Sequence, residues 1–295
     1  MNAPISLFVY NRPDHTRQTL ESLKKNSLAK NSHLYIFSDG PKKEKDMPKI
    51  TEVRKMVKNI TGFKSVTVKE RKSNFGLAKS IIEGVTEIIN LHERVIVLED
   101  DIVTAPNFLS FMNTNLKFYE NESSVACISG YVYPIDGLPD TFFLKGADCW
   151  GWATWKRAWK FFNPDGTLLY KELKKRKLLR LFNFNHTTSY NKMLIDQING
   201  KNDSWAIRWY ASTFLNNMYC LYPGNSLVIN TGMDGSGTHC SISENFTSTL
   251  DFVPKRCKKK SVKEDEIVRK QFEGFFRGLN EGFFTKIKTK LKLQF

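Results

Sequence analysis

The stretch Val95-Ile96-Val97-Leu98-Glu99-Asp100-Asp101 joins four consecutive apolar residues directly to three carboxylates. A short, continuously apolar run is typical of a strand that is buried on both faces of a parallel sheet. Three adjacent like charges are costly unless water solvates them or a cation neutralises them, and hard divalent cations prefer oxygen ligands. The run therefore predicts a buried strand, and the triplet is either a solvated turn or a metal site.

Three further apolar runs precede this strand and alternate with helical patterns. They are the following: Ile5–Val9, Leu34–Phe37 and Val66–Val68. The longest helical pattern extends from Phe75 to Leu91. Such alternation predicts an α/β fold with a mostly parallel central sheet that is flanked by helices. Ligands bind at the carboxyl ends of such strands, where Arg12, Asp39 and the acidic triplet are placed.

The net charge of +15 is distributed unevenly along the chain. Residues 255–295 contain thirteen Lys and Arg against five Asp and Glu. A second basic cluster consists of these residues: Lys171, Lys174, Lys175, Arg176, Lys177 and Arg180. A local excess of this kind indicates a polyanionic partner such as nucleic acid, an anionic membrane surface or a phosphorylated substrate.

The C-terminal region looks like an appended helix. Its stretch 282–293 mixes two phenylalanines with four lysines. This composition is typical of an amphipathic segment at an anionic membrane surface. A charged helix that packs back on the domain, or a solvated tail, explains the same composition equally well.

Leader and anchor sequences are not evident. No stretch approaches 18 uninterrupted apolar residues, and the first ten residues lack a basic leader. The five cysteines include no C-x-x-C pair, which favours reduced thiols over a disulfide framework. We therefore expect a cytoplasmic protein, peripheral on the inner face of the membrane if the tail binds lipid.

The segment Trp150-Gly151-Trp152 begins a tryptophan-rich region that also contains Trp155 and Trp159. Aromatic faces next to a glycine can form a floor for a sugar ring or a base. The same rings can equally form a hydrophobic plug between the sheet and a second subdomain. The sequence leaves both roles open.

Two polar residues further along the chain are candidates for chemistry. Asp203 precedes an apolar helical turn that contains Trp205, so it is either an N-cap or a general base over an acceptor hydroxyl. His239 ends a Gly-rich stretch that starts at Gly232. Such a stretch is either a plain loop or one that brings an imidazole and backbone N–H groups to a metal-bound diphosphate.

Three common nucleotide and hydrolase signatures are missing. The sequence contains no G-x-x-x-x-G-K-[ST], so a P-loop ATPase is excluded. No G-x-G-x-x-G follows the first strand, and no G-x-S-x-G elbow occurs. These absences argue against the usual dinucleotide site and against an α/β-hydrolase.

Taken in order, these segments resemble glycosyltransferases of the GT-A fold. The resemblance is closer to the N-acetylglucosaminyltransferase I type and its bacterial relatives than to family 2 glycosyltransferases. It covers about residues 4–240. It depends on these motifs: Phe8-Val9-Tyr10-Asn11-Arg12-Pro13, Ser38-Asp39-Gly40, Asn74-Phe75-Gly76-Leu77, Val97-Leu98-Glu99-Asp100-Asp101, Ala105-Pro106-Asn107-Phe108, Trp150-Gly151-Trp152, Asp203-Ser204-Trp205 and Ser236-Gly237-Thr238-His239.

The resemblance implies a metal-dependent, inverting hexosyl- or N-acetylhexosaminyltransferase. Its donor would be a nucleotide sugar, UDP-linked by expectation, and its acceptor a hydroxyl of a glycan or lipid-linked molecule in bacterial surface polysaccharide or glycolipid synthesis. It divides residues 1–253 into a nucleotide-binding half (1–104) and an acceptor half (105–253). Residues 254–295 would then form a basic amphipathic tail.

The resemblance also implies roles for individual residues. Asp101 and His239 would bind Mn²⁺ or Mg²⁺, and Asp203 would be the catalytic base, although Asn202 stands where this family commonly has a second acid. The residues implied for donor binding are these: Arg12, Asp39, Asn74, Lys79, Glu99 and Asp100. The residues implied for a sugar platform are these: Trp150, Gly151, Trp152 and Trp205.

Two other functions stay open at this stage. A basic nucleic-acid-binding protein would explain the net charge and the aromatic residues, but the predicted site is acidic and no nucleic acid is expected. A protein with the GT-A fold that only binds its ligand is the second alternative. The intact acidic triplet argues against that alternative.

Overall fold

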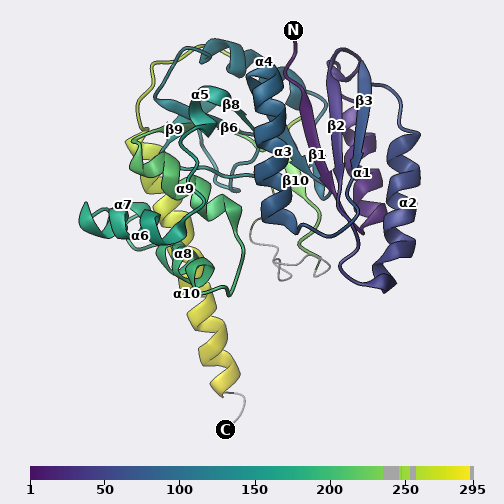
Figure 1. Ribbon diagram of the computed structural model, residues 1–295. Helices are drawn as coiled ribbons and strands as arrows, with labels where there is room; N and C mark the ends of the chain where they lie inside the picture. Colours follow the sequence, from purple (N-terminus) through teal and green to yellow (C-terminus); the bar gives the residue numbers. More distant parts are fainter. Residues whose placement is uncertain (235–245, 247, 253–256, 293–295) are drawn as a thin grey trace.

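The computed structural model describes residues 1–234, 246, 248–252 and 257–292. Its centre is an eight-stranded sheet in the order β3-β2-β1-β4-β8-β6-β9-β7 (Figure 1). Four of the seven strand pairings are parallel. The strands are β1 Ile5–Val9, β2 His33–Ser38, β3 Ser65–Glu70, β4 Arg94–Glu99, β6 Val125–Ser129, β7 Thr141–Leu144, β8 Trp152–Trp155 and β9 Tyr219–Pro223. The predicted α/β fold with a mostly parallel sheet is confirmed.

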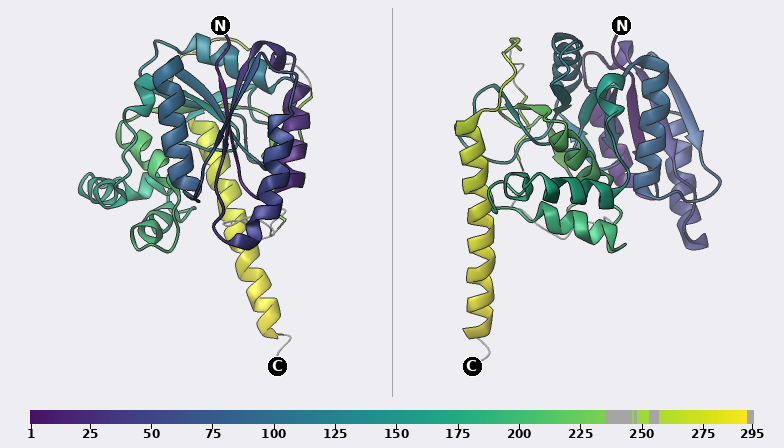
Figure 2. Two further views of the ribbon diagram at one scale, coloured as in Figure 1. Left: turned by 45° about the vertical axis from the view of Figure 1, so that its right-hand side comes forward. Right: turned by 60° about the vertical axis from the view of Figure 1, so that its left-hand side comes forward.

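Helices cover both faces of the sheet (Figure 2). They are α1 Pro13–Lys24, α2 Met47–Lys58, α3 Leu77–His92, α4 Phe108–Phe118, α5 Lys156–Trp159, α6 Gly166–Lys175, α7 Leu179–Phe182, α8 Tyr190–Ile198, α9 Trp205–Leu215 and α10 Glu266–Lys292, with 3₁₀ turns at Ala29–Asn31 and Glu44–Asp46. In α3 the apolar residues recur at helical spacing, and Ile81, Val85 and Ile88 are fully buried. The helix predicted over Phe75–Leu91 is therefore present with nearly the same bounds.

The first four strands are parallel neighbours in the sheet. β1 lies between β2 and β4, with Leu7 opposite Ile36 on one side and Leu98 on the other. All five residues of β1 are buried, as expected for a central strand with helices on both faces. The carboxyl ends of these strands consequently meet at one edge of the sheet, which we call the carboxyl edge.

The second half of the chain completes the same sheet. β8 runs antiparallel to β4, with Trp152 opposite Val97. Strands from both sides of the expected boundary between residues 104 and 105 therefore belong to one sheet. Beside it, β5 Ile102–Thr104 and β10 Val228–Asn230 form a two-stranded antiparallel sheet. This small sheet brings the residues that follow β10 against the acidic triplet.

The first half of α10 packs against the domain. Val268, Phe272 and Phe276 are buried, so this part of the expected tail belongs to the core. The second half projects beyond the rest of the molecule (Figures 1 and 2). Within the described residues, no helix has both the length and the apolar character needed to cross a membrane.

Candidate active site at the carboxyl edge

Arg12 and two carboxylates of the acidic triplet form an ion-pair cluster at the carboxyl edge. The Nη2 of Arg12 donates to Asp100 Oδ1 and, at 2.8 Å, to Asp101 Oδ2. Asp100 and Asp101 are only 4% and 6% exposed, so water contributes little to their solvation. The sequence left open a solvated turn or a metal site for the triplet. The burial of Asp100 and Asp101 disagrees with a solvated turn.

One guanidinium does not balance three carboxylates. Burial and the neighbouring Asp101 and Asp100 raise the pKa of Glu99 to about 8. Burial also raises the pKa of Asp100, although the charge of Arg12 opposes that shift. For Arg12, burial opposes the charged form, but the two aspartates outweigh it and the pKa is raised. These raised pKa values show that ionisation of the carboxylates is poorly compensated here, and a further cation would favour their ionised form.

The chain folds closely around Arg12 and Asp101. Thr231 donates its backbone N–H to the carbonyl oxygen of Asp101 at 2.8 Å. A Cβ atom on Gly232 would lie 2.1 Å from Asp101 Oδ2 and 2.8 Å from Arg12 Nη1, so only glycine fits here without a shift. The Nη1 of Arg12 is buried and has no hydrogen-bond partner among the described residues. A buried donor of this kind is typical of a place where an anionic ligand binds.

These residues fit a divalent metal ion that a phosphate ligand helps to bind. In the described part of the chain, no three His, Cys, Asp or Glu side chains are grouped to hold a metal by themselves. Mg²⁺, however, is commonly held by one or two carboxylates together with substrate phosphate oxygens. Asp100 and Asp101 supply two buried carboxylates of that chemistry, and a cation would favour their ionised form.

Asp39 and Asn74 connect two loops at the same edge. The carboxylate of Asp39 accepts backbone N–H groups of Phe75 at 2.9 Å and of Gly76 at 3.0 Å. Asn74 donates its side-chain amide to the carbonyl oxygen of Gly40 at 3.0 Å. Asp39 thus places a negative charge at the N-terminus of α3, which stabilises that helix. The structure shows both residues positioning the loops at this edge.

Phe75 lies between two cations beside this turn. The guanidinium of Arg71 lies 4.2 Å from the centre of its ring, and the Lys79 ammonium lies 4.4 Å from it. Lys79 is exposed and also pairs with Glu83 at 3.7 Å. Arg71 was not among the residues singled out from the sequence, although it directly follows β3 and the strand-end rule could have identified it.

The four residues of the implied sugar platform have different environments. Trp152 and Trp205 are 1% and 3% exposed, and their rings stack with centroids 5.3 Å apart. Gly151 has a φ of +59°, and a Cβ there would lie 2.9 Å from Val228. Trp150 alone is partly exposed, with its ring against Tyr131. Burial therefore favours the packing role for Trp152, Gly151 and Trp205, and leaves Trp150 as the accessible ring.

Asp203 is held by a buried arginine. The Nη2 of Arg208 donates to Asp203 Oδ1 at 3.0 Å, while its Nε donates to the carbonyl oxygen of Ser204 at 3.1 Å. The Asp203 side chain is 66% exposed, whereas Arg208 is buried. The N-cap of α9 is Ser204, whose hydroxyl accepts from the N–H of Ile207, so Asp203 is not that cap.

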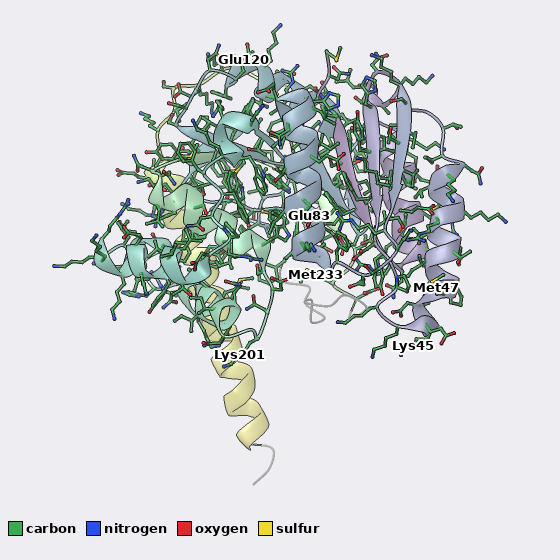
Figure 3. The ribbon with its side chains drawn as sticks, in the orientation of Figure 1. Lys45, Met47, Glu83, Glu120, Lys201 and Met233 are labelled. Atoms are coloured by element: carbon green, nitrogen blue, oxygen red, sulfur yellow. The ribbon has the colours of Figure 1, made fainter. Side chains whose placement is uncertain are left out.

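The tryptophan stack connects Asp203 to the acidic triplet. Asp203 lies two residues before Trp205, which stacks on Trp152. Trp152 is opposite Val97, and Glu99 lies two residues beyond Val97. The segment that carries Asp203 is therefore tied to the neighbouring strand of the carboxyl edge. Figure 3 marks this side of the molecule by Met233 and the opposite side by Glu120. The implied metal ligand His239 lies outside the described residues.

A half-buried carboxylate that the sequence did not single out lies in the second half of the chain. Asp148 accepts hydrogen bonds from the hydroxyls of Tyr222 at 2.7 Å and Tyr133 at 2.8 Å. Burial raises the pKa of Asp148. Its position among aromatic rings depends on contacts between distant residues, and no local sequence signal identifies it.

Comparison with known proteins finds similarity only at the level of structure. No protein-family model matches the sequence, and no curated protein matches it well enough to count as a relative. Similar solved structures include a mannosyltransferase from Pyrobaculum calidifontis in complex with GDP-Man and Mn²⁺ (12% identity, TM-score 0.32), covering 45% of this chain and 36% of that one. Two structures of S. aureus TarS are also similar, one of residues 1–349 (12% identity, TM-score 0.43) and one longer (14%, 0.36).

The first of these structures is described as that of a mannosyltransferase. The TarS structures cover 76% and 75% of this chain, but the chain spans only 59% and 36% of them. Identities of 12–14% are too low to transfer a role to any residue. The chemistry of the site therefore has to be argued from the geometry of this chain.

Proposed function

We propose that this protein is a metal-dependent, inverting glycosyltransferase that uses a nucleotide-diphosphate sugar. The observation that carries the proposal is the pairing of two features at the carboxyl edge. One is the buried Arg12–Asp100–Asp101 cluster, which has a buried donor without a hydrogen-bond partner in the described part of the chain and carboxylates whose ionisation is poorly compensated. The other is the exposed carboxylate of Asp203, which Arg208 holds on the neighbouring part of the site.

The first half of the chain, residues 1–104, would bind the donor. The buried Nη1 of Arg12 would donate to a diphosphate oxygen, and Asp101 would hold Mn²⁺ or Mg²⁺, with His239 as a second ligand. A bound divalent cation would neutralise the charge that the leaving nucleoside diphosphate acquires. Glu99 and Asp100 would face the ribose and donor sugar. Asp39 and Asn74 would shape the loops around the base, which we expect to be uracil.

Residues 105–253 would bind the acceptor. The Oδ2 of Asp203 would take the proton from the acceptor hydroxyl as the hydroxyl oxygen forms a bond to the anomeric carbon. The bond from that carbon to the diphosphate breaks at the same time, and attack from the opposite face inverts the centre. The partly exposed ring of Trp150 is available for a sugar. The transferred group would be a hexose or an N-acetylhexosamine.

The basic C-terminal region favours an acceptor at a membrane surface. The second half of α10 projects from the molecule, and the stretch 282–293 is rich in lysine and apolar residues. A peripheral enzyme on the inner face of a bacterial membrane could then act on lipid-linked acceptors of surface polysaccharide or glycolipid synthesis.

The proposal is tested by turnover of a panel of nucleotide sugars in the presence of Mn²⁺. We expect release of nucleoside diphosphate from one nucleotide class, and loss of that release in Asp101→Asn. The matched control is Asp196→Asn, which changes another aspartate, paired with Lys192 on α8. No turnover of any nucleotide sugar by a folded protein, also with glycan and lipid-linked acceptors added, would overturn the proposal.

A further inference from the structure

Six exposed basic residues gather on α6, on α7 and on the turn between them. They are Lys171, Lys174, Lys175, Arg176, Lys177 and Arg180. The one carboxylate within 171–180 is Glu172, so six cations face a single acid and the stretch carries a net charge of +5. Glu172 pairs with Arg176 at 3.3 Å and Lys175 at 3.9 Å. The catalytic proposal gives this cluster no role.

The fold joins this cluster to α10. Arg269 of α10 donates from Nη2 to the carbonyl oxygen of Leu181, the third residue of α7, at 2.8 Å. Asn185, just after α7, donates to Glu273 Oε1 at 2.6 Å and accepts from Arg180 Nε at 3.1 Å. The two stretches of sequence with the largest basic excess are therefore in direct contact, although about 90 residues separate them.

Exposed cations continue from α7 onto α10. Lys270 and Arg277 are exposed, and Arg277 lies one helical turn beyond Glu273, on the edge of α10 that contacts Asn185. We call the six cations of α6 and α7, together with Lys270 and Arg277, the basic surface. Figure 1 shows α7 beside α10 on the side of the molecule away from α1 and α2.

The uncharged residues of α6 and α7 favour a lipid partner over nucleic acid. Leu168 and Leu181 are 52% and 44% exposed beside the cations. The aromatic residues of these two helices are Tyr170, which is half-buried, and Phe182, which is buried. Leucines among lysines suit the boundary between headgroups and acyl chains, whereas binding of single-stranded nucleic acid uses exposed aromatic rings for base stacking.

α10 extends towards the side of the molecule that carries the candidate site, so a membrane bound by α10 would lie on that side. α10 projects past the body in the direction in which β1 runs to its carboxyl end (Figure 1). Met233, next to the Arg12 cluster, and Lys201 lie on that side, and Glu120 lies on the opposite side (Figure 3). A bilayer in contact with α7 and α10 would therefore face the carboxyl edge.

We propose that the basic surface, formed jointly by α6, α7 and α10, binds an anionic lipid bilayer and turns the carboxyl edge towards it. The inference deepens the proposed function by naming the surface that would present a lipid-linked acceptor. Lipid binding itself is measured without any turnover. Failure of the catalytic proposal and failure of this one are therefore distinguishable.

The test is co-sedimentation of the full chain with vesicles of phosphatidylcholine alone or mixed with phosphatidylglycerol. We expect binding only to the mixed vesicles, weakening as salt is raised. Because each Lys or Arg near an anionic surface strengthens binding roughly five-fold, the variant Lys174→Gln/Lys175→Gln/Lys177→Gln should bind at least about ten-fold more weakly. The control Lys30→Gln/Lys64→Gln/Lys117→Gln removes the same charge from exposed lysines outside the basic surface and away from the carboxyl edge, and should bind like the parent protein.

A third variant, Lys286→Gln/Lys288→Gln/Lys290→Gln, measures the contribution of the tail to vesicle binding apart from that of α6 and α7. A joint surface predicts that this variant and the α6 variant each weaken binding and that the combination weakens it further. The proposal would be overturned if the α6 variant and its control lost vesicle binding equally. It would also be overturned if only the tail variant lost vesicle binding. Binding of oligonucleotides but not of anionic vesicles would identify a nucleic-acid surface instead. Unchanged urea unfolding shows that each variant is folded.

Discussion

The Nη2 of Arg12 lies 2.8 Å from Oδ2 of Asp101, and this ion pair connects the loop after β1 to the turn after β4. The same nitrogen also donates to Asp100. Both aspartates are almost inaccessible to water, so the folded state depends on Arg12 to compensate their charge. Arg12 therefore has a structural role as well as the proposed role in binding a diphosphate.

Replacing Arg12 with Met leaves the two aspartates buried without their cation. We expect the free energy of unfolding to fall by about 3 kcal/mol, the lower end of the range for breaking a buried pair, because the Arg12 side chain is 19% exposed. Urea denaturation at neutral pH measures the change. The control is Arg17→Met, which removes an exposed arginine paired with Asp14 and should cost less than about 1 kcal/mol. Similar small losses in both variants would show that Arg12 does not compensate a buried charge.

Truncation of the tryptophans separates packing from ligand binding. Because Trp205 is buried against Trp152, Trp205→Ala should destabilise the protein by about 3–5 kcal/mol. Trp150→Ala should cost much less, because that ring is partly exposed, and should instead weaken binding of the donor or acceptor. Urea denaturation and ligand titration of both variants provide the comparison. A stable Trp205→Ala protein with impaired ligand binding would return Trp205 to the sugar platform.

The stability of the protein should depend on pH through Asp148. Burial raises its pKa in the folded state, so the folded protein keeps this proton at pH values where the unfolded chain has lost it. Stability therefore falls as pH rises from about 4, the unfolded pKa, through the raised folded pKa. Relative to Asp148→Asn, which cannot ionise, the parent protein should lose stability between pH 4 and pH 7 in urea unfolding.

Asp196 provides a control of opposite sign. A hydrogen bond from Lys192 lowers the pKa of this half-buried aspartate. Its contribution to stability is present above the unfolded pKa and is lost as pH falls through the folded pKa. Relative to Asp196→Asn, the parent protein should therefore gain stability as pH rises. If the stability difference changed in the same direction with pH for Asp148→Asn and Asp196→Asn, burial would not be raising the pKa of Asp148.

Asp203 and Arg208 should affect turnover more than stability. Asp203→Asn should reduce kcat by about 10²–10⁴-fold, the usual contribution of a general base, and leave donor binding intact. The loss of stability should be at most about 1 kcal/mol, because the Asp203 carboxylate is 66% exposed.

Arg208→Lys keeps the charge but loses the fixed geometry of the donors to Asp203 and Ser204, so its kcat should lie between those of the parent protein and Asp203→Asn. The loss should appear in kcat while donor binding stays intact, which a general loss of structure would not produce. Unchanged turnover in Asp203→Asn would assign the base to another residue.

The sequence predicts the first half of this fold well because its signals are local. Each of the four predicted strands is a short, mostly apolar run, and the runs form adjacent parallel strands. Arg12, Asp39 and the acidic triplet follow strands, so the strand-end rule brings them to one edge without knowledge of their contacts. The partner of the triplet could not be predicted, because the contact between Arg12 and Asp100 spans 88 residues.

The second half is less predictable because its packing is non-local. Trp152 looks like a candidate ligand platform in sequence, but β8 is an antiparallel insertion between β4 and β6 that buries it. Phe276 reads as part of an amphipathic tail and is covered by distant aromatic residues, including Tyr133. A hydrophobic pattern predicts that such residues pack in the core or contact a ligand or membrane. Only the three-dimensional fold distinguishes these two roles.

The proposed metal-assisted nucleotide-sugar site is best tested by the Tm of the protein, measured with each of a panel of nucleoside diphosphates in the presence and absence of Mn²⁺. A ligand at about 100 times its Kd adds roughly 2.7 kcal/mol to the stability of the folded state, which is readily seen as a rise in Tm. We expect a rise in Tm with one nucleoside diphosphate that requires Mn²⁺, disappears in Asp101→Asn and persists in Asp203→Asn. A rise that is independent of the metal and of Asp101, or no rise with any nucleotide, would contradict it.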